Sequence, residues 1–185
     1  MALLTTDNSP VGAAIPVVDM DQITARRTAY REHFCRRRSV PGITSILTED
    51  HRHGDRLFAA AMRAAEERNW SECRRDFDAF LETLNRHLKI EEAVLFPAFE
   101  AATGMAGGPT FVMRHEHQQM RAILERIGAA LEARNSAEFH PLARSFSELM
   151  DAHSAKEERV LYPMCDRNLP DFDVEQLKST LTPQS

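Results

Sequence analysis

Residues 87–97 read His-Leu-Lys-Ile-Glu-Glu-Ala-Val-Leu-Phe-Pro, and residues 153–163 read His-Ser-Ala-Lys-Glu-Glu-Arg-Val-Leu-Tyr-Pro. The second stretch begins 66 residues after the first, and both carry His-x3-Glu followed by Val-Leu-aromatic-Pro. At the same offset, the pair Asp-His at 50–51 is repeated as Glu-His at 116–117. Because chance rarely places such matches in register, the chain contains a duplicated unit rich in metal-binding residue types.

Six residues of this duplicated unit are candidate metal ligands, three from each copy. In chain order they are His51, His87, Glu91, His117, His153 and Glu157. Residues four apart lie on the same face of an α-helix, about 6 Å apart, so each His-x3-Glu can hold one metal ion or bridge two. The two copies together would deliver four imidazoles and two carboxylates to one shared centre.

The chain around these residues predicts an all-α fold. From Ile43 onward, apolar residues recur at steps of three and four, and no strand-like alternation interrupts them. Four helices are expected, at 43–67, 70–102, 109–133 and 141–167.

Local signals set these helix boundaries. Asn69 and Asn135 are each followed three residues later by Glu, which resembles a capping box at a helix start. The segment from Gly104 to Pro109 predicts a break between the second and third helices. Pro141 disfavours helical geometry at the residue before it, so we expect the long part of the fourth helix to begin at Pro141.

The candidate ligands lie on the apolar stripes of these helices. In the second helix, Phe80 and Leu84 precede His87 at helical spacing, and the other three helices place a candidate histidine in the same way. A buried carboxylate without a partner is costly, and buried charges are usually paired or bound to metal. A metal centre inside the helices is therefore the simplest partner for all six groups.

The other histidines are expected to take no part in this centre. His53 and His115 each lie two residues from a candidate ligand, but they point away from the apolar stripe and lack a histidine at the equivalent repeat position. His33 and His140 have no repeat partner either. We expect surface or packing roles for these four side chains.

Further residues near the ligands repeat or stand out. Glu92 and Glu158 repeat, and we expect them to lie on the surface or to accept a hydrogen bond from a metal-bound imidazole, with direct metal ligation as the alternative. We expect Phe96 and Tyr162 to pack in the core, with the alternative that the Tyr162 phenol reaches the site. Met113 is expected to be core filler.

The length, composition and net charge of the chain narrow the class of protein. A chain of 185 residues with 43% hydrophobic residues suits one domain with its own core, and the formal charge of −5 provides no basic field for nucleic acid. Residues 22–38, which hold six arginines and one acid, are expected to be a solvated helix face, with an acidic partner as the alternative. We expect no membrane span, no signal peptide and reduced cysteines, hence a cytoplasmic protein.

The same signals divide the chain into three parts. We expect residues 1–42 to be an N-terminal tail with an extra helix over 19–38. Residues 43–168 would form the helical domain, and residues 169–185 a C-terminal tail.

The order His, His-x3-Glu, His, His-x3-Glu, with acidic-His openings and Leu-aromatic-Pro closings over residues 43–167, resembles the hemerythrin-like HHE cation-binding domain family. The resemblance implies an up-down-up-down four-helix bundle that holds two non-haem irons. Carried over to this chain, the resemblance implies that His51 and His87 would hold one iron. His117 and His153 would hold the other, and Glu91 and Glu157 would bridge the two.

This chain departs from parts of the family in two ways. Oxygen-carrying hemerythrins have a further His one turn before the third-helix His, where this chain has Met113, and they close with His-x4-Asp instead of His-x3-Glu. The iron–sulfur-cluster repair proteins share the six-ligand set, but they also carry an N-terminal cysteine pair. The N-terminal segment of this chain has only Cys35, which weakens that identity.

The ligand count suggests a function. Each metal would receive two imidazoles and two carboxylate oxygens, and a bridging oxide or hydroxide would leave an open position on six-coordinate iron, which invites dioxygen, peroxide or nitric oxide. We therefore expect a diiron protein that binds or senses dioxygen or a related small oxidant, or handles iron. The alternative is a redox-defence enzyme acting on peroxide or nitric oxide. Zinc or manganese in place of iron, including a structural zinc pair, stays open, and the oligomeric state is not predicted.

Overall fold

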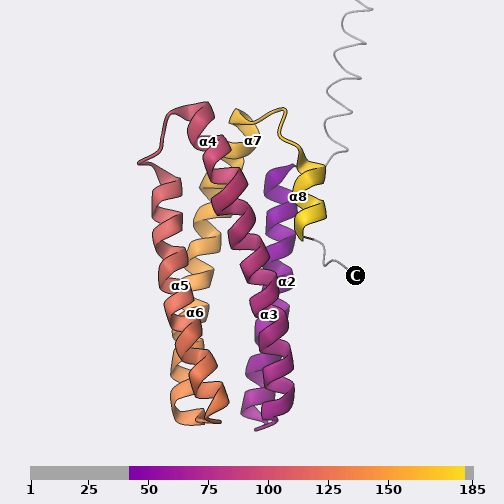
Figure 1. Cartoon of the computed structure of the whole chain (residues 1–185), viewed down its shortest axis with the longest axis vertical. Coiled ribbons are helices and arrows are strands. Elements are labelled where there is room, and N and C mark those ends of the chain that lie inside the picture. The colour runs from indigo at the N-terminus through magenta and orange to yellow at the C-terminus, as the bar shows by residue number, and fades with distance from the viewer. Residues whose placement is uncertain (1–41, 182–185) are drawn as a thin grey trace, which may run out of the picture. The chain divides into compact units, whose positions relative to one another are not determined.

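The computed structural model describes residues 42–181 of the chain (Figure 1). The expected helix over 19–38, together with His33 and Cys35, lies outside these residues. Within residues 42–181 there are helices and no strand, as the sequence predicts.

Four long helices within the described range form an up-down-up-down bundle. Helix α2 packs along α3, α5 packs along α6, and further contacts of α2 with α6 and of α3 with α5 complete the bundle. Their bounds are α2 Ile43–Glu66, α3 Trp70–Ile90, α5 Pro109–Glu132 and α6 Ser136–Lys156.

Both helices that carry His-x3-Glu continue through one wide turn. The π-helical segment η1 (Glu91–Leu95) joins α3 to α4 (Phe96–Thr103), and η2 (Glu157–Leu161) joins α6 to α7 (Tyr162–Asn168). The cause lies in the proline that closes each motif, because proline lacks an N–H and its ring clashes with the carbonyl four residues earlier in an α-helix. A wider turn relieves that clash. In each motif the wide turn therefore begins at the glutamate.

The two tight turns at the other end of the bundle are built alike. Arg68 and Arg134, which occupy equivalent repeat positions, both have left-handed backbone, with φ of 58° and 49°. The amide of the following asparagine returns to the helix, from Asn69 to the Ala64 carbonyl and from Asn135 to the Ala130 carbonyl, both at 2.8 Å. This pattern ends the first helix of each pair.

The same asparagines start the next helix, as the capping boxes predict. Asn69 accepts from the Glu72 amide, and Asn135 accepts from the Glu138 amide, each at 3.3 Å. The second cap corrects the expectation for Pro141, because α6 begins at Ser136 and contains Pro141 within it. The asparagine cap and the complete burial of Phe139 stabilise the turns that the proline disfavours.

The start of α2 is fixed from another helix. Asp166 of α7 accepts from the Ile43 amide at 2.8 Å and from the Thr44 hydroxyl at 2.6 Å. A Cβ atom at Gly42 would stand 2.8 Å from the Asp166 carboxylate, so this close approach requires glycine. The helix that bears His51 is thereby held against the helix that follows the second motif.

The segment expected to be a C-terminal tail contains a further helix. Helix α8 (Val174–Leu181) contacts α2 and α3, and its Leu177 is 1% exposed. The sequence signal for this helix is weak, because the helix is short and buries a single fully enclosed side chain.

The buried apolar side chains of the described region form two clusters, one on each side of the candidate ligands. One cluster fills the end near the Arg68 and Arg134 turns and includes Phe58, Phe77 and Phe146. The other gathers around Phe96 and Tyr162 and includes Leu177. The candidate ligands therefore lie between two clusters of buried apolar side chains.

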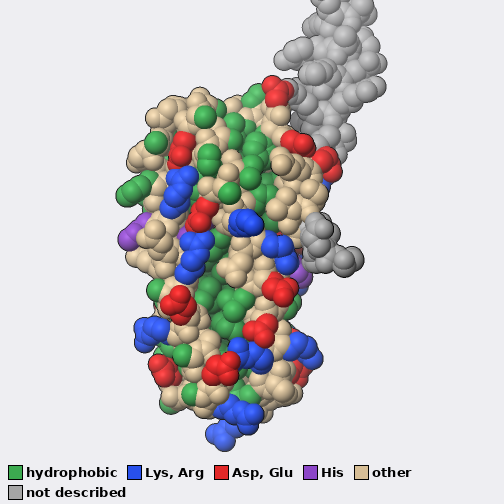
Figure 2. All heavy atoms as spheres, viewed as in Figure 1, with side chains coloured by type: hydrophobic (Ala, Val, Ile, Leu, Met, Phe, Trp, Pro, Cys, Tyr) green, Lys and Arg blue, Asp and Glu red, His purple; other side chains and the backbone are tan. Residues whose placement is uncertain are grey.

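The surface offers no extended field of one charge on the face shown in Figure 2, where Lys and Arg side chains stand among Asp and Glu. No helix in residues 42–181 is long and apolar enough to cross a membrane.

The left-handed turns predict a stabilising substitution. Arg68→Gly and Arg134→Gly should each raise the free energy of unfolding by about 1 kcal/mol, because glycine adopts this backbone without the steric cost of a Cβ atom. Chemical denaturation measures the change. The matched control is Arg63→Gly, in the last turn of α2, which should lower stability by about 1 kcal/mol. A loss of stability in Arg68→Gly would contradict this account of the turns.

Candidate metal centre

The structure brings all six candidate ligands together in the middle of the bundle. The four histidines come one from each long helix, and the two glutamates stand at the first positions of η1 and η2. They form two groups suited to a metal ion that share one carboxylate. The first group is His51, His87 and Glu157, and the second is Glu91, His117, His153 and Glu157. Five of the six are buried, and the His51 side chain is 10% exposed.

In the first group, the Nε2 atoms of His51 and His87 are 3.1 Å apart. Glu157 Oε2 lies 3.3 Å from His51 Nε2, and Glu91 Oε2 lies 3.5 Å from His87 Nε2. The side chains of this group come from α2, α3 and η2, and Glu91 comes from η1.

The second group repeats this arrangement. The Nε2 atoms of His117 and His153 are 3.2 Å apart. Glu157 Oε1 lies 3.2 Å from His153 Nε2, and Glu91 Oε2 lies 3.4 Å from His117 Nε2. Glu157 thus directs one oxygen to each group, while a single oxygen of Glu91 lies near both.

These spacings fit two metal ions. Imidazole and carboxylate ligands stand about 2.1 Å from a divalent metal such as zinc, so two ligands at about a right angle are roughly 3 Å apart. The donor atoms of each group have this separation. Glu157 has the geometry of a bridge between two metals, and Glu91 is placed to contact both.

A carboxylate on the far side of each imidazole fixes which nitrogen faces the centre. The four Nδ1-to-carboxylate pairs are His51–Glu158 at 2.9 Å, His87–Asp50 at 2.8 Å, His117–Glu92 at 2.8 Å and His153–Glu116 at 2.9 Å. A hydrogen on Nδ1 donates to each carboxylate and leaves the Nε2 lone pair for a metal. Of the roles open to Glu92 and Glu158, the structure shows support of an imidazole.

The sequence alone did not predict that Asp50 and Glu116 support ligand imidazoles. Both precede a candidate ligand directly, yet each supports the histidine of a neighbouring helix, His87 and His153 respectively. The repeated acidic-His pair at 50–51 and 116–117 was the available signal. Only the packing of the helices shows which imidazole each carboxylate reaches.

Two buried oxygen atoms test whether the centre suits a cation. Within the described residues, Glu91 Oε2 and Glu157 Oε1 are fully enclosed and have no hydrogen-bond partner. A buried carboxylate oxygen left without a donor is strongly unfavourable. Both oxygens point at the space between Nε2 atoms, so a metal ion there satisfies the atoms that nothing else satisfies.

The pKa shifts of the candidate ligands also follow from their burial close to one another. Burial, reinforced by the charge of Glu157, raises the pKa of Glu91 well above its ordinary value. Burial also opposes the charge of Glu157, but the imidazoles of His153 and His51 beside it outweigh burial and hold the pKa of Glu157 well below its ordinary value. Burial and the neighbouring His153 lower the pKa of His117 to about 4. Two carboxylates this close resist sharing negative charge unless a cation lies between them.

Tyr162 corrects the expectation that it only packs. Its hydroxyl donates to Glu91 Oε1 at 2.7 Å and to Glu157 Oε2 at 2.9 Å, and the side chain is fully buried. In an α-helix, five residues of separation would rotate Tyr162 roughly 140° away from Glu157. The wide turn η2, in which the Tyr162 amide donates to the Glu157 carbonyl, brings the phenol back to the same side.

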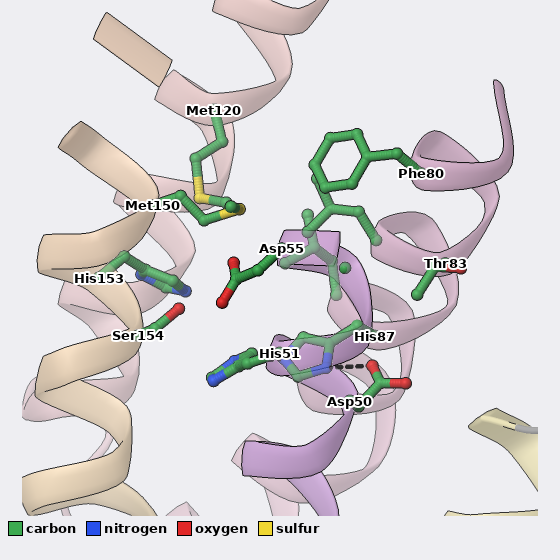
Figure 3. Close-up of a pocket in the computed structure, with 13 residues that line it drawn as sticks. Asp50, His51, Asp55, Phe80, Thr83, His87, Met120, Met150, His153 and Ser154 are labelled. Carbon is green, nitrogen blue, oxygen red and sulfur yellow. Dashed lines mark hydrogen bonds and ion pairs between the residues drawn. The ribbon is translucent and has the colours of Figure 1, made fainter. Parts of the chain in front are cut away.

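A small cavity lies against the first group on the side away from Tyr162. Its volume is about 20 Å³, which is room for one water-sized molecule. His51, His87 and His153 border it, and Phe80, Met120 and Met150 form its apolar wall. Figure 3 shows Asp55 of α2 pointing into the space between His51 and His153.

The residues expected to be bystanders lie away from the centre. His53 and His115 are exposed, and His115 contacts Gln119 at 3.2 Å. Met113 is buried in the cluster around Phe96. Cys73 and Cys165 are buried free thiols outside both ligand groups, and burial raises the pKa of Cys73 to about 11.

Removing a supporting carboxylate should weaken metal binding without removing a ligand. Asp50→Ala should lower metal affinity by roughly 10–100-fold, because His87 loses the acceptor that orients its ring. Competition with a chelator, followed by metal analysis of the protein, measures the affinity. Glu49→Ala, an exposed neighbour on the same helix, serves as the control and should bind metal like the parent. Equal affinity of the two variants would show that Asp50 does not support the site.

Comparison with known proteins supports the same assignment. The profile of one family, described as the hemerythrin HHE cation binding domain, matches residues 42–165. Neither the comparison with curated proteins nor the comparison with solved structures gave a match. The matched range covers most of the chain and includes all six candidate ligands. The chain therefore belongs to the hemerythrin HHE cation-binding domain family.

Proposed function

We propose that the centre holds two iron ions and that the protein binds or senses dioxygen or a related small oxidant there. The observation that carries this proposal is the cavity of about 20 Å³ bordered by three of the candidate ligand histidines. A site used only to stabilise the fold has no need of free space beside its ligands. A cavity of this size suits a molecule not much larger than water, such as a diatomic gas.

The donor set supports iron as the metal. Each group offers two imidazoles and carboxylate oxygens, a mixture that suits iron, and none of the ligand atoms is sulfur. A structural zinc site is usually closed by four ligands. The cavity beside the first group argues for a metal that keeps a position open to an incoming molecule. Manganese binds the same donor types, so metal analysis must decide between them.

Residues around the cavity also suit a redox-defence enzyme acting on peroxide or nitric oxide. Reduction of peroxide consumes protons, and a carboxyl group stands where it could pass one on. Asp55 borders the cavity, and burial raises its pKa. Oxygen evolution from added peroxide would favour the enzyme, and a reversible spectral change on oxygenation without turnover would favour binding.

Metal content tests the proposal directly. Protein purified in air should carry about two irons per chain and absorb in the near ultraviolet from an oxo-bridged pair. Glu157→Ala should lose both metals, because Glu157 directs an oxygen to each group. His53→Ala, which alters an exposed histidine, should retain both. Stoichiometric zinc with negligible iron would contradict the proposal.

The role of the cavity is tested at Gly54, which lines it. A Cβ atom at Gly54 would lie 3.8 Å from Phe80, an ordinary contact, so Gly54→Ala places a methyl group against the cavity without a clash. Gly54→Ala should keep the iron and slow the binding of nitric oxide several-fold, as followed by stopped-flow absorbance.

The matched control is Gly128→Ala. Gly128 is also helical and has no contact closer than 4.0 Å at its Cβ position, but it does not line the cavity. Both substitutions should stabilise their helices by about 1 kcal/mol, so stability cannot explain a difference in binding rate. Equal binding rates in the two variants would show that the small ligand does not enter through this space.

A further inference from the structure

The two halves of the centre differ at one position of the repeated motif. Tyr162 occupies in the second copy the place that Phe96 occupies in the first. The Tyr162 ring centroid lies 5.7 Å from the His51 ring at 31°, and the Phe96 ring centroid lies 5.8 Å from the His117 ring at 23°. The two rings therefore hold equivalent places, and the phenol oxygen is the difference between them.

That oxygen stands among the donor atoms of the first group. Tyr162 Oη is 3.2 Å from His51 Nε2 and 3.3 Å from His87 Nε2. It is also 2.7 Å from Glu91 Oε1 and 2.9 Å from Glu157 Oε2. Ligands of one metal at about right angles are roughly 3 Å apart. Oη has this spacing to three donor atoms of that group, the Nε2 atoms of His51 and His87 and Oε2 of Glu157, whereas a hydroxyl that only supported one ligand would approach one of them.

We propose that Tyr162 is a ligand of the metal held by His51 and His87, and that the metal held by His117 and His153 has no equivalent ligand. On metal binding the O–H bond of the phenol breaks, the oxygen bonds to the metal, and the proton is released. The inference rests on the proposed two-metal function and adds that the two metals are chemically different. It also leaves the cavity, on the side away from Tyr162, as the open face of that metal.

The charged side chains around the supporting carboxylates also differ between the two halves of the centre. Arg121 donates to Glu92 at 3.0 Å, and Lys156 donates to Glu116, so cations accompany the carboxylates that support His117 and His153. The equivalent repeat positions hold Asp55 and Ile90, which carry no positive charge. The metal beside Tyr162 therefore has the more negative surroundings, which favour the higher oxidation state of iron.

The pseudo-symmetry of the chain supplies the test. Iron-loaded parent protein should show a phenolate-to-iron(III) absorption in the visible, with phenolate vibrations in the resonance Raman spectrum. Tyr162→Phe should lose both signals and keep its iron content. The exchange variant Phe96→Tyr/Tyr162→Phe moves the phenol to the other half and should restore the signals. A visible band that persists in Tyr162→Phe with the iron retained, or no such band in the iron-loaded parent, would overturn the proposal.

A zinc experiment separates this inference from the proposed function. Addition of Zn²⁺ to protein stripped of metal should produce an ultraviolet difference spectrum of phenolate in the parent and none in Tyr162→Phe. If the purified protein contains zinc and no iron, the proposed function fails, and this measurement still decides whether Tyr162 is a ligand. Zinc binding without a phenolate signal in the parent would overturn the inference whatever metal the protein carries.

Discussion

Two carboxylates buried side by side in the middle of a helical bundle are the constraint on which the rest of the structure depends. Glu91 and Glu157 are fully enclosed, and each has an oxygen without a hydrogen-bond partner in the described part of the chain. Apolar clusters on both sides keep water away. Such a pair is tolerable only when positive charge lies between its oxygens, and the four Nε2 atoms around it complete a site for metal.

The wide turns connect the motif to this centre. Each precedes a proline, which disfavours the regular α-helical turn before it, and each begins at a candidate ligand glutamate. The turn makes the residue five positions after the glutamate face the same side. For this reason Phe96 and Tyr162 both point inward, and the exchange of Phe for Tyr between the copies brings a phenol oxygen among the candidate ligands.

Duplication supplies the candidate ligands of the centre, and the differences between the two copies make its two halves chemically unequal. Tyr162 stands opposite Phe96, and Asp55 opposite Arg121. The cavity borders the first half at Asp50 and Asp55, while the second half carries cations that accompany its supporting carboxylates. A symmetric ligand set can thus hold two metals with different surroundings, one of which faces the space where a small molecule fits.

The sequence by itself predicted the four long helices, the six candidate ligand positions and the choice of His51 over His53, because spacing along one helix face is a local property. It also predicted the asparagine caps, which act within one turn. The tertiary structure decided the rest. Asp50 supports His87 on the neighbouring helix, Tyr162 enters the site through a non-α turn, and α8 replaces part of an expected tail. These features depend on which helix faces meet, and the period of a single helix carries no information about its neighbour.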